Sequence, residues 1–318
     1  MSTVLVTGGA GFIGSHLCEK LLELGYRVIN LDNFNDFYDP KIKRKNILTA
    51  LSNRRYTLIE GDIRDRKLLE KTFNTFNIDT VVHIAALAGV RASIGSPLEY
   101  VDVDIKGTIN LLEFSRDFKV KKFIFASTSS VYGLNSIPFK EDGIKSPISP
   151  YAAAKLAGEL FCSTYNMLYD IPVVCLRFFT VYGPRQRPEM AIHYFTRLID
   201  EGKEVPIWGD GTSSRDYTYI DDIINGIVAS IYLKCSFDIF NLGNSNPIKL
   251  NDLIDLIEQK LGKSARRVYL PVQKGDMEHT YADITKSKTI LGYNPEVSIE
   301  EGIEKFIDWY KRQEYAQF

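Results

Sequence analysis

The chain has 318 residues, of which 45% are hydrophobic and 25% charged, a length and composition that allow a large core in a water-soluble globular protein. Its formal net charge is −1, and neither a basic stripe for nucleic acid nor a polybasic run for a membrane surface is present. No leader pattern and no apolar run of roughly 20 residues occurs, so we expect a cytoplasmic protein whose four scattered cysteines are reduced.

The first half of the chain alternates strand patterns with helix patterns. Short runs rich in β-branched and aromatic residues cover 4–8, 26–33, 55–62, 80–86, 121–128 and 173–179. Helix patterns lie between them, over 15–25, 66–76, 97–116 and 151–168. The strand runs are continuously apolar, as in parallel strands that helices cover on both faces. The pattern predicts a doubly wound parallel α/β sheet of the Rossmann type.

The turn after the first strand reads TGGAGFIGS, with Gly8, Gly11 and Gly14 at dinucleotide-binding spacing. Such a turn brings the backbone close to a pyrophosphate, and the next helix N-terminus points its free N–H groups at the phosphates. Asp32 ends the second strand, where a carboxylate suits the ribose hydroxyls of NAD and repels the extra phosphate of NADP. The sequence therefore predicts NAD as cofactor. The alternative is that a Lys or Arg from 41–45, in a surface excursion over 34–54, reaches back and admits NADP.

Further cofactor contacts are predicted where later strands end. Asp62 and Ile63 follow the third strand, at the expected adenine edge. Small alanines follow the fourth and let a flat ring approach, although plain core packing is an alternative. The residues predicted to contact NAD are Gly8, Gly11, Phe12, Ile13, Gly14, Asp32, Asn33, Asp62, Ile63, Ala85, Ala86, Ala88, Tyr151 and Lys155.

A tyrosine and a lysine one helical turn apart, in SPYAAAK, form a candidate catalytic pair with a threonine of ASTSSVYG. Tyr151 and Lys155 share a helix face, so the ammonium can lower the pKa of the phenol, by about 1–3 units for close charges. Desolvation raises that pKa, so the positive charges must outweigh it. Thr128 ends the fifth strand and can hydrogen-bond the oxygen that Tyr151 deprotonates. Tyr-x-x-x-Lys alone is a common surface pair, but the glycine loop and Thr128 favour catalysis.

After about residue 180 the pattern changes to loops with proline and arginine, short strands and helices. It predicts a smaller α+β domain for the substrate. We expect an NAD-binding domain over 1–180 and about 216–246, and a substrate domain over 181–215 and 247–318. No metal-ligand spacing occurs among the histidines and cysteines, so we expect no metal.

The motifs TGGAGFIGS, DI at 62–63, HIAALAGV, STSSVYG and SPYAAAK, in this order, resemble those of the extended short-chain dehydrogenase/reductases. The later GPR, SSRDYTYIDD and NLGN are similar to the nucleotide-sugar epimerases and dehydratases of that family, so that the resemblance covers nearly the whole chain. It implies tightly held NAD, catalysis by Thr128, Tyr151 and Lys155, and a C-terminal domain that binds a nucleoside-diphosphate sugar. It also implies a homodimer through the helices near 97–116 and 151–168.

At two positions the sequence differs from the motifs of other family members, and these differences limit the reactions that it can catalyse. The dehydratases carry Asp-Glu after the threonine, and UDP-glucuronate decarboxylases carry a glutamate at the second of these positions. Here the residues are Ser129 and Ser130, which cannot act as acid or base at neutral pH. The resemblance therefore implies 4-epimerisation through a 4-keto sugar, with Tyr151 as the base. Asp104 also stands where many relatives have asparagine, and no function is assigned to that difference.

The segment RFFTVYGPRQRPEMA suggests the substrate. Thr180 stands where UDP-galactose 4-epimerases have asparagine, and the pattern TVYGPxxRPxMA resembles that of UDP-glucuronate 4-epimerases. A uronate carboxylate is recognised by hydroxyls, backbone N–H groups or a cation. The candidates for this role are Ser129, Ser130, Thr180 and Arg187, with Arg185 as the nearby rival. The alternative for Arg187 is a loop ion pair with Glu189.

For the nucleotide, Arg215 matches the family's pyrophosphate-binding arginine, whose planar fork of donors suits phosphate. Lys274 could replace a second arginine. The leading prediction is an NAD-dependent isomerase that interconverts UDP-glucuronate and UDP-galacturonate. The alternatives are a 4-epimerase of neutral UDP-sugars, a UDP-glucuronate decarboxylase, and a non-catalytic NAD-binding regulator.

Overall fold

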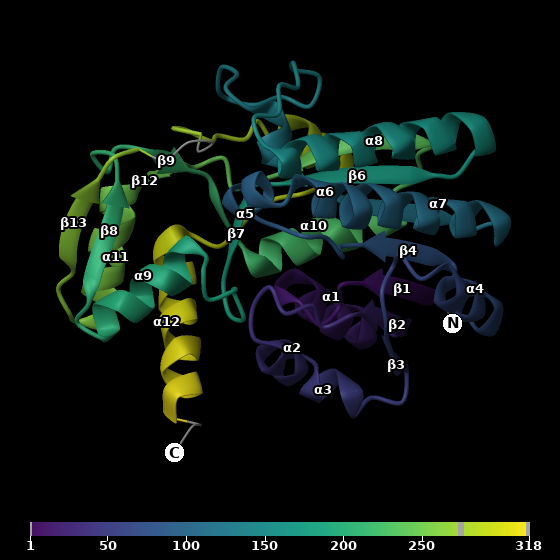
Figure 1. The fold of residues 1–318 in the computed structure, drawn as a ribbon, viewed down its shortest axis with the longest axis horizontal. Helices are drawn as coiled ribbons and strands as arrows, with labels where there is room; N and C mark the ends of the chain where they lie inside the picture. The colour runs from purple at the N-terminus through teal and green to yellow at the C-terminus, as the bar shows by residue number, and fades with distance from the viewer. Residues whose placement is uncertain (1, 273–276, 316–318) are drawn as a thin grey trace.

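A seven-stranded parallel sheet forms the centre of the molecule (Figure 1). The computed structural model describes residues 2–272 and 277–315. The strand order is β11-β6-β5-β4-β1-β2-β3. These strands are β1 (Thr3–Thr7), β2 (Arg27–Asp32), β3 (Tyr56–Glu60), β4 (Thr80–His83), β5 (Lys122–Thr128), β6 (Val173–Phe178) and β11 (Phe237–Leu242). The doubly wound fold predicted from the sequence is confirmed, although β4 ends at His83 and the residues up to 86 form a loop.

Helices cover both faces of this sheet, which explains the continuously apolar strands. On β1, Val4 and Val6 pack into one core while Leu5 packs into the core on the opposite face, because successive side chains of a strand alternate. One face carries α1 (Phe12–Glu23) and α10 (Ile220–Tyr232), with α2 (Pro40–Asn46) and α3 (Leu48–Leu51) beside α1. The other carries α4 (Arg66–Thr75), α5 (Val90–Gly95), α6 (Pro97–Tyr100), the π-helix η1 (Val101–Lys106), α7 (Gly107–Asp117) and α8 (Pro150–Tyr169).

A second group of elements lies beside the carboxyl ends of the strands, at the left of Figure 1. Its helices are α9 (Ala191–Asp200), α11 (Leu250–Leu261) and α12 (Ile299–Tyr315). Three small sheets pair β8 (Glu204–Trp208) with β13 (Arg266–Leu270), β7 (Thr180–Tyr182) with β10 (Tyr217–Tyr219), and β9 (Ser214–Arg215) with β12 (Ile248–Lys249). The segment 284–293 contains the short π-helix η3 (Ser287–Leu291), directly preceded by two α-helical residues. The division into two domains stays a prediction.

A buried ion pair joins α8 to the middle of the sheet. Arg177 on β6 is fully buried and donates from Nε and Nη2 to the carboxylate of Glu159 on α8, at 2.9 and 2.7 Å. The Oγ of Ser127 on β5 also donates to Glu159. Arg177 Nη1 donates to the Oη of Tyr132, which donates in turn to Asn241 on β11. The network therefore ties three adjacent strands to the helix that carries the predicted catalytic pair.

Within the described residues, no helix is both long enough and apolar enough to cross a membrane.

Candidate active site

A cavity opens at the carboxyl ends of β1, β2, β4 and β5 and extends towards β7 and β9. The lining includes every predicted site residue except Arg185. It thus brings together side chains from the glycine loop to Arg215 that are far apart in the sequence. The suggested Lys274 lies outside the described residues.

The glycine loop is shaped for a dinucleotide, because its glycines leave no room for side chains. Gly8 has φ +73°, and a Cβ there would lie 2.8 Å from the backbone N of Ala85. A Cβ on Gly14 would lie 2.1 Å from the carbonyl oxygen of Gly8. The helix α1 begins directly after Gly11, with no side-chain cap on its first N–H groups. These donors remain available for phosphate oxygens.

Asp32 holds the glycine loop as well as lining the cavity. Its Oδ2 accepts from the backbone N of Ala10 at 2.9 Å, and its Oδ1 accepts from the backbone N of Phe34 at 2.8 Å. The carboxylate is buried at the end of β2. Its position beside the loop is the one that a ribose diol would need.

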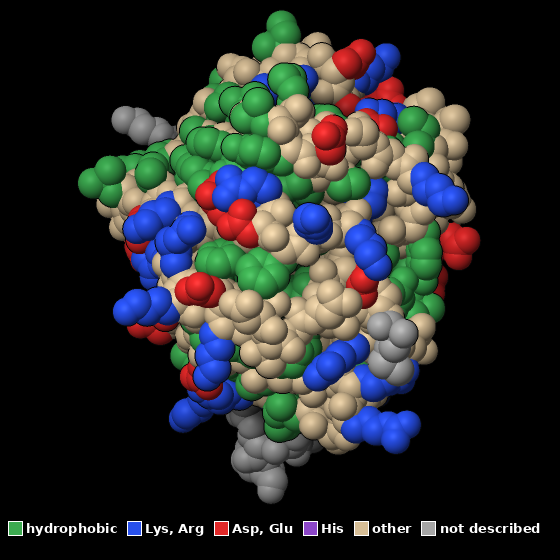
Figure 2. Space-filling view, turned by 90° about the vertical axis from the view of Figure 1, so that its right-hand side faces the viewer, with side chains coloured by type: hydrophobic (Ala, Val, Ile, Leu, Met, Phe, Trp, Pro, Cys, Tyr) green, Lys and Arg blue, Asp and Glu red, His purple; other side chains and the backbone are tan. Residues whose placement is uncertain are grey.

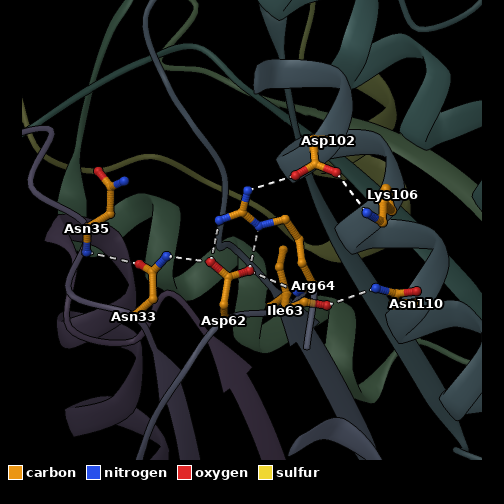
Figure 3. Close-up of polar contacts among 8 residues, drawn as sticks. All are labelled: Asn33, Asn35, Asp62, Ile63, Arg64, Asp102, Lys106 and Asn110. Atoms are coloured by element: carbon orange, nitrogen blue, oxygen red, sulfur yellow. Dashed lines mark hydrogen bonds and ion pairs between the residues drawn. The ribbon is translucent and has the colours of Figure 1, made fainter. Parts of the chain in front are cut away.

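The predicted adenine end is a polar network centred on Asp62 and Arg64 (Figure 3). Asp62 Oδ1 accepts from the backbone N and Nε of Arg64, and Oδ2 accepts from Arg64 Nη2 and from Asn33 Nδ2, all at 2.8–2.9 Å. Arg64 Nη1 also donates to Asp102 on η1 at 2.7 Å, and Lys106 pairs with the same carboxylate. The Arg64 contact is the main reason why the pKa of Asp62 falls to about 2. Asp62 is therefore ionised at physiological pH, with Arg64 and Asn33 as hydrogen-bond donors.

Thr128, Tyr151 and Lys155 converge on the cavity from β5 and α8. Thr128 is the last residue of β5, and its Oγ1 accepts from the backbone N of Ser130 at 3.2 Å. Ser149 caps α8 by accepting from the backbone N of Ala152, which places Tyr151 in the first turn. Lys155 is buried one turn later, with its Nζ 4.8 Å from the centre of the Phe125 ring. All three side chains therefore line the same cavity, and their catalytic role stays a prediction.

Burial dominates the ionisation of this group. It raises the pKa of Tyr151 to about 12, whereas a hydrogen bond with Thr128 and the charge of Arg187 lower that pKa. Burial also lowers the pKa of Lys155, and the carboxylate of Asp104 raises it. In the protein without cofactor, Arg187 is thus the cation whose charge lowers the pKa of Tyr151. That Lys155 does so stays a prediction.

The cavity lining also includes the predicted substrate residues other than Arg185. Ser129 and Ser130 form the start of the 3-10 helix η2 (Ser129–Tyr132), and Thr180 opens β7. Arg187 lies 5.6 Å from the centre of the Phe37 ring and also pairs with Glu189 at 3.2 Å. Arg187 therefore forms the loop ion pair that was its alternative and also lines the cavity, whereas binding of a carboxylate stays a prediction.

Arg215 lines the far end of the cavity and is oriented by backbone carbonyls. Its Nη1 donates to the carbonyl oxygens of Ser214 and Glu278, each at 3.0 Å. Arg185, by contrast, turns away from the cavity. Its Nη2 donates to Glu19 on α1 at 2.9 and 3.0 Å. We therefore leave Arg185 out of the substrate site and assign it to the contact between its loop and α1.

Several cavity residues come from the excursion over 34–54, where the sequence predicted only a possible basic residue near the ribose. Lys43 is buried, donates from Nζ to the carbonyl oxygen of Asn35 at 2.6 Å and lies 4.7 Å from the Tyr38 ring centre. Phe37, Tyr38 and Lys43 all line the cavity, as does Arg64. The available signal was a group of aromatic residues followed closely by a cluster of basic residues in this stretch.

A sequence model of the GDP-mannose 4,6 dehydratase family matches residues 5–306 of this chain. The chain belongs to that family. This membership agrees with the sequence motifs, which resemble those of the extended short-chain dehydrogenase/reductases. UDP-glucuronate 4-epimerase of Thermodesulfobacterium geofontis (strain OPF15) is 46% identical over 313 residues, which make up 98% of this chain and 97% of that protein.

Solved structures of family members have the same fold. UDP-glucuronic acid 4-epimerase from Bacillus cereus, in complex with UDP-glucuronic acid and NAD, matches with a TM-score of 0.92 and 42% identity, over 98% of this chain and 99% of that one. UDP-glucose 4-epimerase from Thermotoga maritima, with UDP-glucose, matches with a TM-score of 0.91 and 36% identity over the same shares of the two chains.

Proposed function

We propose that this protein is an NAD-dependent isomerase that interconverts UDP-glucuronate and UDP-galacturonate by epimerisation at carbon 4. The observation that carries the proposal is a single cavity lined by the glycine loop and by Thr128, Tyr151 and Lys155. The two residues that follow Thr128 in the chain, Ser129 and Ser130, line the same cavity. The dehydration and decarboxylation expected of other family branches would require acidic side chains at those serines. The similarity to UDP-glucuronate 4-epimerases supports the choice of substrate.

The residues of the cavity fit NAD. The glycine loop would hold the pyrophosphate, Asp32 the adenosine ribose, and the wall around Asp62 and Ile63 the adenine. NAD, when bound, supplies reversible hydride transfer at carbon 4 of the sugar. The buried Asp32 next to the loop favours NAD over NADP, because a phosphate on the ribose would meet its negative charge.

The chain's own residues would handle the proton and the orientation of the sugar. Tyr151 would take the proton of the 4-hydroxyl, and Thr128 would hydrogen-bond the same oxygen. The positive charges of Lys155 and Arg187, together with that of the cofactor, must outweigh the burial that raises the pKa of Tyr151. Arg215 would bind the pyrophosphate of the UDP-sugar and so hold the sugar while its two faces exchange.

For the carboxylate of the uronate, we assign Arg187 as cation and Ser129, Ser130 and Thr180 as hydroxyl donors. All four line the cavity. A 4-keto uronate is a β-keto acid and tends to lose carbon dioxide. Hydrogen bonds that keep the breaking bond out of line with the carbonyl would suppress this loss.

Incubation of the protein with UDP-glucuronate, followed by chromatography and mass spectrometry, tests the function. We expect a new isomer of unchanged mass. The loss of carbon dioxide would mean a decarboxylase. Turnover of UDP-glucose or its N-acetylated form, without turnover of UDP-glucuronate, would favour the neutral-sugar epimerase to which the Thermotoga maritima match points. No turnover of any UDP-sugar would favour an NAD-binding regulator.

Replacement of Arg187 by glutamine tests the carboxylate site. We expect UDP-glucuronate to bind about 10- to 100-fold more weakly to R187Q, because a hydrogen bond to a charged group contributes roughly 1.5–3 kcal/mol. Binding of UDP-glucose, which lacks the carboxylate, should change little. Calorimetry on the NAD complex with both ligands measures this, and R187K should recover part of the loss. Equal weakening of both ligands would place Arg187 at the nucleotide or in the loop only.

We also propose a homodimer formed through α6–α7 and α8. Large apolar side chains on these helices are exposed, among them Leu98, Val101, Leu160, Met167 and Leu168. Figure 2 faces the side where α7 and α8 end and shows hydrophobic side chains gathered in its upper part. Burial of such a surface favours association. Sedimentation at twice the mass of the 36.1 kDa chain supports the dimer, and a monomer at micromolar concentration contradicts it.

The predicted domains and compartment complete the proposal. Residues 1–180 with about 216–246 would bind NAD, and 181–215 with 247–318 would bind the UDP-sugar. Proteolytic fragments that retain NAD binding would test the boundaries. A cytoplasmic location fits the four free cysteines, and cell fractionation would test it.

A further inference from the structure

Asp104 is a buried carboxylate next to the proposed catalytic pair. It lies on the π-helix η1, and only 2% of the residue is exposed. Its neighbours Val103 and Ile105 pack with Leu87 and with residues of α6 and α8 in an apolar cluster. A charge in such surroundings is costly unless another charge or a hydrogen bond compensates it.

The two oxygens of Asp104 have different surroundings. Oδ1 accepts from the backbone N of Leu87 at 2.7 Å, in the segment after β4 that lines the cavity. Among the described residues, none donates a hydrogen bond to the buried Oδ2. A backbone contact alone would be served equally well by an amide side chain. The charge of Asp104 must therefore be explained by something other than this hydrogen bond.

The charged and titratable groups around Asp104 show what its negative charge acts on. From α8 it faces Lys155 and Tyr151, and from α6 it faces Tyr100. Lys155 is the cation with the strongest effect on Asp104, and Asp104 is the group that does most to raise the pKa of Lys155. Arg187 lowers the pKa of both Tyr151 and Tyr100, and Glu99 raises that of Tyr100. The other charged residues of η1, Asp102 and Lys106, belong to the network around Arg64.

We propose that the buried negative charge of Asp104 sets the ionisation state of Lys155 and Tyr151 and thereby fixes the pH range in which the pair can work. Asp104 is a positioning residue in this role, because it acts on the reacting oxygen only through the two other side chains. The inference rests on the proposed function of Tyr151 and Lys155.

The direction of the effect follows from the sign of the charge. A nearby carboxylate favours the protonated form of every neighbour, and it accordingly raises the pKa of both Lys155 and Tyr151. It favours the positive form of Lys155 and so opposes the burial that lowers the pKa of that ammonium group. Burial raises the pKa of Asp104 itself to about 6, so this charge is present at neutral pH and is lost below that value.

The test is the substitution Asp104→Asn, which keeps the acceptor for Leu87 and removes only the charge. In the NAD complex, the pKa of Tyr151 is measured from tyrosinate absorbance, as the difference between proteins with and without the second substitution Tyr151→Phe. We expect this pKa to fall by about 1–3 units in D104N. In the turnover of UDP-glucuronate, both limbs of the pH profile of kcat should move to lower pH. Below about pH 6 the two proteins should become similar, because Asp104 is then protonated.

Asp117→Asn is the matched control, because it removes the same charge at a half-exposed position on α7, the helix that continues η1, and Asp117 does not line the cavity. It should leave both limbs in place. A lower kcat in D104N with unmoved limbs and an unchanged Tyr151 pKa would overturn the inference and make Asp104 merely structural. The absorbance titration needs no substrate, so a shifted pKa without any turnover of UDP-glucuronate would uphold the inference and refute the proposed function.

Discussion

Replacement of Tyr151 by phenylalanine should lower kcat by roughly 10²- to 10⁴-fold, which is the usual contribution of a positioned acid–base group. The ring keeps its place in the first turn of α8 and its edge-to-face contact with Tyr100, at 6.2 Å between ring centres. The phenol oxygen alone is lost, and with it the group that takes the proton of the 4-hydroxyl. The rate of UDP-glucuronate conversion, with NAD content measured on the same sample, checks this expectation.

Tyr169→Phe, the same substitution at the exposed end of the same helix, is the control and should leave the rate unchanged. NAD should remain bound in Y151F, because the glycine loop and Asp32 are untouched. Turnover of Y151F close to that of the unchanged protein would remove Tyr151 from the mechanism. A loss of NAD together with activity would instead assign Tyr151 to cofactor binding.

Replacement of Glu159 by alanine should lower the free energy of unfolding by about 3–5 kcal/mol, because it leaves the charge of Arg177 buried without its partner. Both side chains are almost wholly inaccessible to water, and Glu159 accepts three hydrogen bonds. Urea unfolding of the NAD-free protein measures the change.

Glu23→Ala is the matched control, since Glu23 forms an exposed ion pair with Lys20 three residues before it on α1. Such surface pairs contribute about 0–1 kcal/mol. An effect of E159A as small as that of E23A would show that the network around Arg177 does not stabilise the fold. E159Q should lie between the two, because its amide can still accept one of the arginine's hydrogen bonds.

The sheet and most of the cavity could be predicted from the sequence because each signal was local. Buried parallel strands appear as continuous apolar runs, and ligand residues follow directly after the ends of these strands. Gly8, Asp32, Asp62 and Thr128 all lie at or just beyond a strand end, so that the strand order alone brings them together.

The residues that prediction missed depend on tertiary contacts. Nothing in the local pattern shows that Lys43 folds back under the loop at Asn35. The same holds for Arg185, which the sequence places two residues from Arg187 but which the fold directs to Glu19. Its φ of +66° turns the chain at that point, and the two arginines pair with different partners, Glu19 and Glu189.

The stretch 284–293 forms only a short helical turn, which contains the π-helix Ser287–Leu291. The stretch ITKSKTILGY has a helical apolar spacing, yet the structure ends the turn at Gly292, whose φ is +66°. In addition, Ser287 donates to the carbonyl oxygen of Asn241 on β11, a contact between segments far apart in the chain. Propensity alone cannot anticipate such a contact.

The last strand of the central sheet has a consequence for biosynthesis. β11 is the only described neighbour of β6 on its outer side, yet it leaves the ribosome after β7, α9, β8, β9, β10 and α10 have been made. Until then the nascent chain presents an apolar strand edge with unpaired amide and carbonyl groups, the kind of edge that recruits other chains. Completion of synthesis past Leu242 closes this vulnerable period.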